Sequence, residues 1–240
     1  LVRGNQLYTY SGGAWNASSS PSFNWSAVAS SSGGTNLVAV ASGDQVHVST
    51  NSGTTWSAVG VARDWEAVTS SADGLKLAAA VYNGLIYTTT DGGTNWTSRG
   101  SVNRYWTAIA SSADGSKLAA TEVNGQIHTS DDGGATWTAR ASGRACNSVA
   151  SSADGTKLAA VVNGGQIYTS TDSGATWTAR ESNRSWWSIA SSADGTKLAA
   201  AVAFDGQIYT STDSGATWTA RESNRFWYSI ASSADGTKLA

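Results

Sequence analysis

The chain has 240 residues, of which twelve are tryptophan, 26 are glycine and only 13% are charged, and its net charge is −2. This mild acidity lacks the basic character of nucleic-acid binders, and no apolar run approaches the roughly 20 residues of a membrane helix. One cysteine, Cys146, leaves no internal disulfide. Few charges with abundant Ser, Thr, Gly and Trp fit a secreted or cell-surface β-protein. We expect no nucleic-acid partner and no membrane insertion, and the oligomeric state stays open.

One segment recurs along the whole chain. Its copies close on tryptophans spaced alternately 41 and 40 residues apart, namely Trp15, Trp56, Trp96, Trp137, Trp177 and Trp218. A period of this length predicts a repeat architecture, such as a solenoid, a propeller or an array. We interpret residues 1–240 as one domain built from six repeats of 40–41 residues.

The two ends of the chain hold complementary halves of one copy. Residues 1–20 match the later sequence through Trp218, and residues 226–240 match the beginning of a copy. Joining Ala240 to Leu1 would restore a complete copy. A ring closed in this way protects the sheet edges, whereas an open array is expected to have capped ends. We therefore predict an all-β, six-bladed β-propeller in which the N-terminal strands complete the C-terminal blade.

Each full copy is predicted to form a four-stranded antiparallel blade. In one copy the strands cover residues 186–192, 197–202, 207–212 and 218–221, and the second is apolar on both faces, as a strand between neighbouring blades should be. Alternate loops of such a meander lie on opposite faces. The A-D-G turns and the aspartate turns before each closing tryptophan should share one face, while the Asn-Gly-type turns and the connections between blades share the other.

The aspartate turns follow the pattern S-x-D-x-G-x-T-W, as in Ser170, Asp172, Gly174, Thr176 and Trp177. The carboxylate can accept backbone N–H bonds across the bend, and glycine takes positive φ without steric cost. The pattern resembles the Asp-box, or BNR, repeat of sialidase-like β-propellers, and the resemblance covers essentially the full length. It implies that the aspartates are structural and lie on the side of the propeller away from an active site.

The connections between blades carry the candidate binding residues. An arginine recurs there, and two residues later stands a tryptophan in every copy but one: Arg63 and Trp65, Arg104 and Trp106, Arg144 and Cys146, Arg184 and Trp186, Arg225 and Trp227. Glu181, Glu222, Asn183 and Asn224 add acceptors and donors. An aromatic plate beside a guanidinium suits sugars. Two structural interpretations stay open: the tryptophans are packing residues, and the arginines close blade-to-blade contacts by bonding backbone carbonyls.

We therefore predict a non-catalytic carbohydrate-binding protein, a lectin whose partners are glycans or glycoconjugates bound at several quasi-equivalent sites. The alternative is a protein-binding scaffold like the Asp-box propellers that assist photosystem assembly, although these are typically seven-bladed. A sialidase-like glycosidase is the third candidate, but the arginines are copies of one position and Glu181 and Glu222 belong to different blades. No metal-ligand spacing, nucleophile elbow or phosphate loop occurs, so we expect no catalytic residues, metal or cofactor.

Overall fold

The computed structural model describes residues 2–3, 5–11, 13–123, 125–140 and 143–240, and it divides into two compact units, Leu1–Trp106 and Thr107–Ala240. Each unit is considered by itself. The described residues form strands and turns and contain no helix, hence none long and apolar enough to cross a membrane. The predicted junction at Leu1 lies outside these residues.

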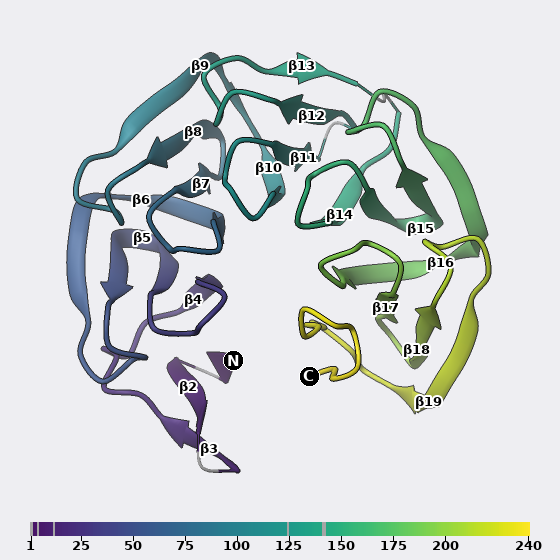
Figure 1. The fold of residues 1–240 in the computed structure, drawn as a ribbon, viewed down its shortest axis with the longest axis horizontal. Coiled ribbons are helices and arrows are strands. Elements are labelled where there is room, and N and C mark those ends of the chain that lie inside the picture. Colours follow the sequence, from purple (N-terminus) through teal and green to yellow (C-terminus); the bar gives the residue numbers. More distant parts are fainter. Residues whose placement is uncertain (1, 4, 12, 124, 141–142) are drawn as a thin grey trace. The chain divides into compact units, whose positions relative to one another are not determined.

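The first unit contains a three-stranded sheet and a six-stranded sheet (Figure 1, purple to blue). The three-stranded sheet has the order β1 (Val2–Arg3), β2 (Gln6–Ser11), β3 (Ala14–Ala17). The six-stranded sheet has the order β4 (Trp25–Ser30), β5 (Leu37–Ser49), β6 (Ser57–Ser70), β7 (Leu77–Val81), β8 (Gly84–Thr89), β9 (Thr97–Arg104).

The second unit contains a four-stranded sheet and a six-stranded sheet (Figure 1, teal to yellow). The four-stranded sheet has the order β10 (Trp106–Ser111), β11 (Leu118–Glu122), β12 (Ile127–Ser130), β13 (Thr138–Ala139), and only the first residue of β10 belongs to the first unit. The other has the order β14 (Cys146–Ser151), β15 (Leu158–Ser170), β16 (Thr178–Ser191), β17 (Leu198–Val202), β18 (Gly206–Ser211), β19 (Thr219–Arg225).

Two long strands explain the six-stranded sheets. The first part of β16 pairs with β15 up to Ser185, and from Trp186 onward the same strand pairs with β17. Strand β6 changes partner in the same way between Asp64 and Trp65. Each long strand is therefore the last strand of one four-stranded repeat and the first strand of the next. The sequence-predicted strands within one copy agree with β16 to β19 to within a few residues.

The second strand of each copy forms the centre of the apolar packing. Its alanines and leucine are almost entirely buried in β7, β11 and β17. Small side chains on both faces allow neighbouring sheets to approach closely on either side of such a strand. The prediction of a strand buried on both faces is confirmed.

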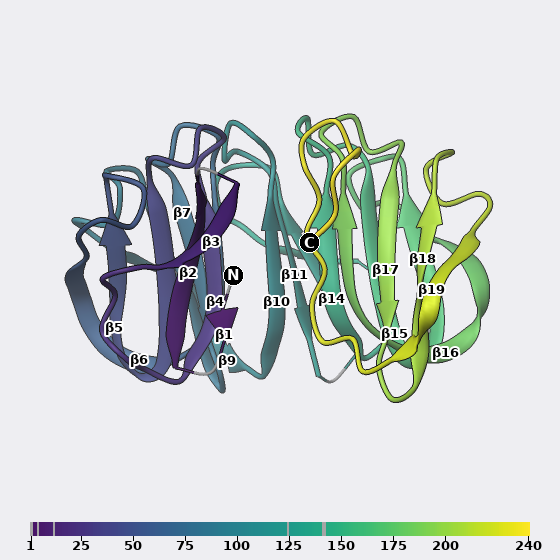
Figure 2. The same ribbon diagram turned by 90° about the horizontal axis from the view of Figure 1, so that it is seen from below.

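The two sets of turns lie at opposite strand ends, as Figure 2 shows within each unit. Lys117 of an A-D-G turn donates to Ser173 of an aspartate turn at 2.9 Å, and the amide of Ser173 donates to the Thr156 carbonyl at 2.9 Å. At the other end, the amide of Ala203 donates to the Ser185 carbonyl at 2.9 Å. In the first unit the amide of Ser52 donates to the Thr35 carbonyl, as the amide of Ser173 does to the Thr156 carbonyl in the second. The predicted division into two faces is therefore confirmed in both units.

Residues 226–240 depart from the prediction of an inner strand. They form only an isolated bridge between Ser232 and Leu239 and no longer strand. Beside this bridge, the Ala231 and Ala240 backbones exchange hydrogen bonds at 2.8 and 3.1 Å. The segment therefore forms a short hairpin around the turn between Ser232 and Leu239.

Candidate functional site

The aspartates of the turns are fully engaged within their own loops. Asp172 accepts hydrogen bonds from the Thr176 hydroxyl at 2.6 Å, the Thr176 amide at 2.9 Å and the Ser170 hydroxyl at 2.8 Å. These bonds, led by that of the Thr176 side chain, lower the pKa of Asp172 from 3.8 to about 2. A carboxylate held in this way stabilises its turn, in agreement with the structural role expected for it.

On the opposite face, three of the predicted arginines lie over tyrosine rings. The guanidinium carbon is 4.4 Å from the ring centroid for Arg63 over Tyr87, 4.3 Å for Arg144 over Tyr168, and 4.7 Å for Arg184 over Tyr209. A cation over an aromatic face is attracted by the ring quadrupole. The half-buried arginines are thereby oriented at the connections between sheets.

The tryptophans two residues after the arginines are placed in the core. Trp186 is 0% exposed, Trp65 2% and Trp106 5%. The indole of Trp186 meets Tyr209 edge-on at 5.1 Å, and that of Trp106 donates to the Gly84 carbonyl at 3.0 Å. Rings buried to this extent offer no face to a sugar. The structure places these three as packing residues, which was the alternative that the sequence left open.

The remaining predicted residues are spread over the same connections. Cys146 is buried, and Arg104 and Trp227 are half-buried. The four other residues are exposed: Asn183, Asn224, Glu222 and Arg225. Half-buried Glu181 lies 3.6 Å from the Arg184 guanidinium. Burial raises the pKa of the Cys146 thiol to about 12, so this thiol is inert. Glu181 and Glu222 lie on two different strands, β16 and β19.

Exposed aromatic rings beside the arginines were missed at the sequence level. In the second unit half-buried Trp187 and exposed Phe204 and Phe226 form a chain with centroids 6.2 and 6.4 Å apart, and Phe204 and Phe226 are 60% and 64% exposed. In the first unit exposed Tyr82 and Tyr105 lie 5.2 Å apart. We call these two groups the aromatic clusters. Both lie at the connection face: the Tyr82 amide donates to the carbonyl of Asp64, which follows Arg63, and the amide of Ala203, which precedes Phe204, donates to the carbonyl of Ser185, which follows Arg184.

A β-bulge explains why Trp187 is accessible while Trp186 is buried. The register of β16 against β17 shifts between Trp186 and Ser188, leaving Trp187 without a partner in the ladder. A bulge re-aims the extra side chain away from the regular alternation. Phe204 lies on the turn after β17 with a φ of 58°, which lifts it from the sheet. The variation of these positions between copies was the signal that could have identified them.

The connection face can bind a ligand by stacking and by hydrogen bonds from guanidinium groups. Within the described ranges, no group of three or more His, Cys, Asp or Glu side chains could hold a metal ion. The two histidines are engaged with carboxylates, His47 with Asp44 at 3.1 Å and His128 with Glu122 at 3.3 Å. The second pair is buried, so neither of its members meets a ligand from solution.

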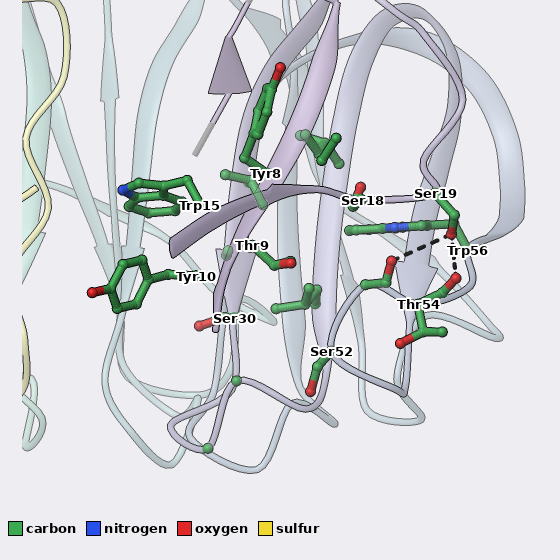
Figure 3. A pocket seen from close by; sticks show the side chains of 18 residues that line it. Tyr8, Thr9, Tyr10, Trp15, Ser18, Ser19, Ser30, Ser52, Thr54 and Trp56 are labelled. Carbon is green, nitrogen blue, oxygen red and sulfur yellow. Dashed lines mark hydrogen bonds between the residues drawn. The ribbon is translucent and has the colours of Figure 1, made fainter. Parts of the chain in front are cut away.

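The first unit also holds a cavity of about 770 Å³ at the other end of its strands (Figure 3). Thr9 and Tyr10 of β2, Ser30 of β4 and Ser52, from the turn in which Asn51 replaces the aspartate, contribute to its lining. The Tyr10 and Trp15 rings, tilted at 60° with centroids 5.3 Å apart, lie on one side of it, and Ser19 donates to the Thr54 carbonyl on another. The cavity is separate from the aromatic clusters.

The fold belongs to the class of β-propellers, as solved structures with similar backbones show. One is YCF48 from Cyanidioschyzon merolae (TM-score 0.70, 18% identity, covering 91% of this chain and 79% of that one), and a YCF48 structure is also described as bound to D1 peptide. Another is the Cps50 (Swd1) β-propeller domain from Myceliophteria thermophila (0.71, 16%, 94% and 81%).

The GH74 enzyme from Niastella koreensis is also similar, with a TM-score of 0.65 and 23% identity over 81% of this chain and 31% of that one. The chain thus spans about a third of the length of this enzyme. No family model and no curated protein sequence matches the chain. The similar structures include enzymes and proteins that are not enzymes, so they show the fold alone.

Proposed function

We propose that this protein is a non-catalytic carbohydrate-binding propeller, a secreted or cell-surface lectin whose repeated sites lie at the connection face. The observation that carries the proposal is that the aromatic clusters and the arginines held over tyrosines occur at the same connection face. Aromatic faces stack on the C–H faces of sugars, while guanidinium groups donate to hydroxyls or to a carboxylate. The sequence analysis expected sugars to stack on tryptophans that the structure shows to be buried. We propose instead that they stack on the rings of the aromatic clusters, namely Trp187, Phe204, Phe226, Tyr82 and Tyr105.

The proposal includes a closed ring of six blades with Asp-box turns, in which residues 1–20 and 226–240 share one blade. Its support is the 40-residue period of the sequence and the four-stranded repeat seen within each unit. Several similar sites on one molecule would gain avidity on a multivalent glycan surface.

A glycan-array screen followed by titration of any hit tests this function. We expect saturable binding of one class of sugar with more than one sugar per chain, and a loss of at least tenfold in affinity for Trp187→Ala and Phe204→Ala. The matched control is Tyr10→Ala, an equally exposed ring outside the aromatic clusters, which should bind normally. Loss of binding only in the control would move the site to the cavity and contradict the proposal.

The second candidate is a protein-binding scaffold. Phe204 and Phe226 carry no polar group, and exposed apolar rings of this kind also serve as anchors for peptides. A YCF48 propeller of similar backbone is described as bound to D1 peptide. Absence of glycan binding, together with binding of a peptide library that Phe204→Ala abolishes, would favour this candidate.

A further inference from the structure

An acidic and a basic side chain of strand β16 face each other at the surface of the second unit. A terminal nitrogen of Arg184, Nη2, lies 3.6 Å from Glu181 Oε1, and the two side chains are 38% and 25% exposed. This separation is longer than the roughly 2.7–2.9 Å of a charge-assisted hydrogen bond. The two charges are therefore paired without being hydrogen-bonded to each other, and both can be reached from solvent.

The arginine of this pair has a fixed orientation. Its guanidinium carbon lies 4.7 Å from the centroid of the Tyr209 ring. Its Nε atom is buried and makes no hydrogen bond to the residues that the structure describes. The edge of the guanidinium that contains Nε is thus closed to a ligand. The terminal nitrogens remain as donors, and one of them faces Glu181.

The glutamate supplies an acceptor beside these donors. The Ser182 hydroxyl donates to Glu181 Oε1 at 3.2 Å, whereas Oε2 accepts no hydrogen bond from the described part of the chain. An ionised carboxylate can accept several hydrogen bonds. The pair therefore presents an unused acceptor next to unused donors.

The backbone at Glu181 has a conformation that favours glycine. Its φ is 36°, and the corresponding residue of the first unit is Gly60 with a φ of 74°. A glutamine side chain holds the carbonyl in both places, from Gln45 to Gly60 at 2.8 Å and from Gln166 to Glu181 at 3.0 Å. The loop thus requires positive φ, which costs a glutamate more than a glycine. Because a partly exposed ion pair adds little to stability, folding alone does not account for this glutamate.

The pair lies at the same end of its sheet as the aromatic cluster of the second unit. The Ser185 carbonyl, one residue after Arg184, accepts a hydrogen bond from the Ala203 amide at 2.9 Å, and Phe204 follows Ala203. An aromatic ring stacks on one face of a sugar, and a neighbouring donor and acceptor bind its hydroxyls. The two features can therefore act on one ligand.

We propose that Glu181 and Arg184 make this site selective for neutral sugars that carry hydroxyls on two adjacent ring carbons. One hydroxyl donates to Glu181 Oε2, and the other accepts from a terminal nitrogen of Arg184. A sugar carboxylate bound to the same arginine would lie beside the Glu181 carboxylate, and like charges placed together oppose binding. Acidic sugars are excluded for this reason. The inference rests on the proposed function and names the class of sugar for one of its sites.

The next connection provides a matched control. Glu222 has a φ of 49°, and its carbonyl accepts from Gln207 at 2.9 Å, so its backbone resembles that of Glu181. Its arginine, Arg225, is exposed and donates from Nε to the Ser223 hydroxyl at 3.4 Å. Within the part of the chain that the structure describes, Glu222 therefore has the same backbone conformation without an ion pair to its arginine.

Matched pairs of sugars test the selectivity in the full chain. The probes are the methyl glycosides of glucose, galactose and mannose, each with the methyl glycoside of its uronic acid, which differs only at C6. By calorimetric titration, we expect at least one neutral member to bind and its acidic partner to bind about tenfold more weakly or worse. Glu181→Gln removes the charge and keeps the size of the side chain, so it should bring the two affinities to within about twofold. Glu222→Gln should keep the preference.

Three results of this titration would overturn the inference. They are equal or tighter binding of the acidic member by the unaltered protein, an unchanged preference in Glu181→Gln, and an equal loss of preference in Glu222→Gln. Absence of binding to every probe and to the glycan array would contradict the proposed function itself. Failure of the selectivity is thus distinguishable from failure of carbohydrate binding.

A thermal measurement separates recognition from folding. Glu181→Gly relieves the strain of positive φ but gives the unfolded chain more freedom, and these two effects oppose each other. The unfolding midpoint should therefore stay within about two degrees while the preference for the neutral sugar is lost. Glu222→Gly should have a similar midpoint and keep the preference. A midpoint lowered by about five degrees or more in Glu181→Gly alone would assign this glutamate to the fold and overturn the inference.

Discussion

The two faces of the repeats differ in the environment of their side chains: polar groups are hydrogen-bonded within the loops of the turn face, and aromatic rings are exposed at the connection face. At the turn face, Asp132, Asp172 and Asp213 each accept bonds from the serine and threonine of their own loop, and the loops are nearly the same in every copy. At the connection face, rings such as Phe204 and Tyr82 are exposed and differ from copy to copy. A face whose polar groups are satisfied internally supports the fold, and a varied and exposed face is available for ligands.

Adjacent tryptophans give the strongest test of this division. Trp186→Ala should destabilise the protein by about 3–5 kcal/mol, because a fully buried indole leaves a cavity. Trp187→Ala is the matched control on the other side of the bulge. It should leave the free energy of unfolding within about 1 kcal/mol and reduce ligand binding. Chemical denaturation of both variants measures the difference, and equal losses of stability would contradict the assignment of the two rings.

Acid should weaken the turn face of the whole molecule. The pKa values of Asp91, Asp132, Asp154, Asp172 and Asp213 are lowered from 3.8 to about 2 by hydrogen bonds within their turns. A carboxyl whose folded pKa is lowered contributes stability that is present above its unfolded pKa and lost as the pH falls to its folded pKa. Thermal midpoints should therefore be constant above about pH 5 and fall between about pH 4 and pH 2. A midpoint independent of pH in that range would contradict the engagement of these carboxylates.

Two neighbouring aspartates allow the contribution of these hydrogen bonds to stability to be tested within one loop. Asp132 accepts bonds from the Thr136 amide and the Ser130 hydroxyl, both at 2.8 Å, whereas exposed Asp131 beside it has its carboxylate outside this set of bonds. Asp132→Ala should lower the thermal midpoint by a few degrees and Asp131→Ala by less than one. Differential scanning calorimetry measures both, and a larger shift for Asp131→Ala would reverse the assignment.

The arginines of the connection face should have the smallest effect on stability. Arg184→Ala removes a cation over the Tyr209 ring, an interaction of about 0.5–1 kcal/mol at a partly exposed site. Arg184→Lys keeps the charge without the planar fork and serves as the comparison. We expect near-normal unfolding for both and weaker glycan binding for both, more so for alanine. A stability loss above 2 kcal/mol for alanine would assign the arginine to the fold.

The strands and the two faces could be predicted from the repeat. Comparing the copies with one another within the chain shows which positions are constant and which vary. The arginines were also identified, but their aromatic neighbours were not. Trp186 and Trp187 are adjacent and chemically identical, and only the bulge in β16 decides which one is buried. Phe204 was missed because it lies on a turn whose backbone conformation is not set by the strand alternation. After residue 226 the structure has an isolated bridge between Ser232 and Leu239 in place of the first strand of a copy.

The change of partner within β6 and β16 bears on how such a chain can change in length. Each sheet draws its first strand from the end of the preceding copy, so the boundary of the genetic repeat need not coincide with the boundary of a sheet. Recombination between any two equivalent points removes or adds about 40 residues in register. When the exchange falls at the change of partner, between Asp64 and Trp65 or between Ser185 and Trp186, it lies between two ladders and not within one. A change of copy number at these points therefore keeps the hydrogen-bond pairing within each remaining sheet.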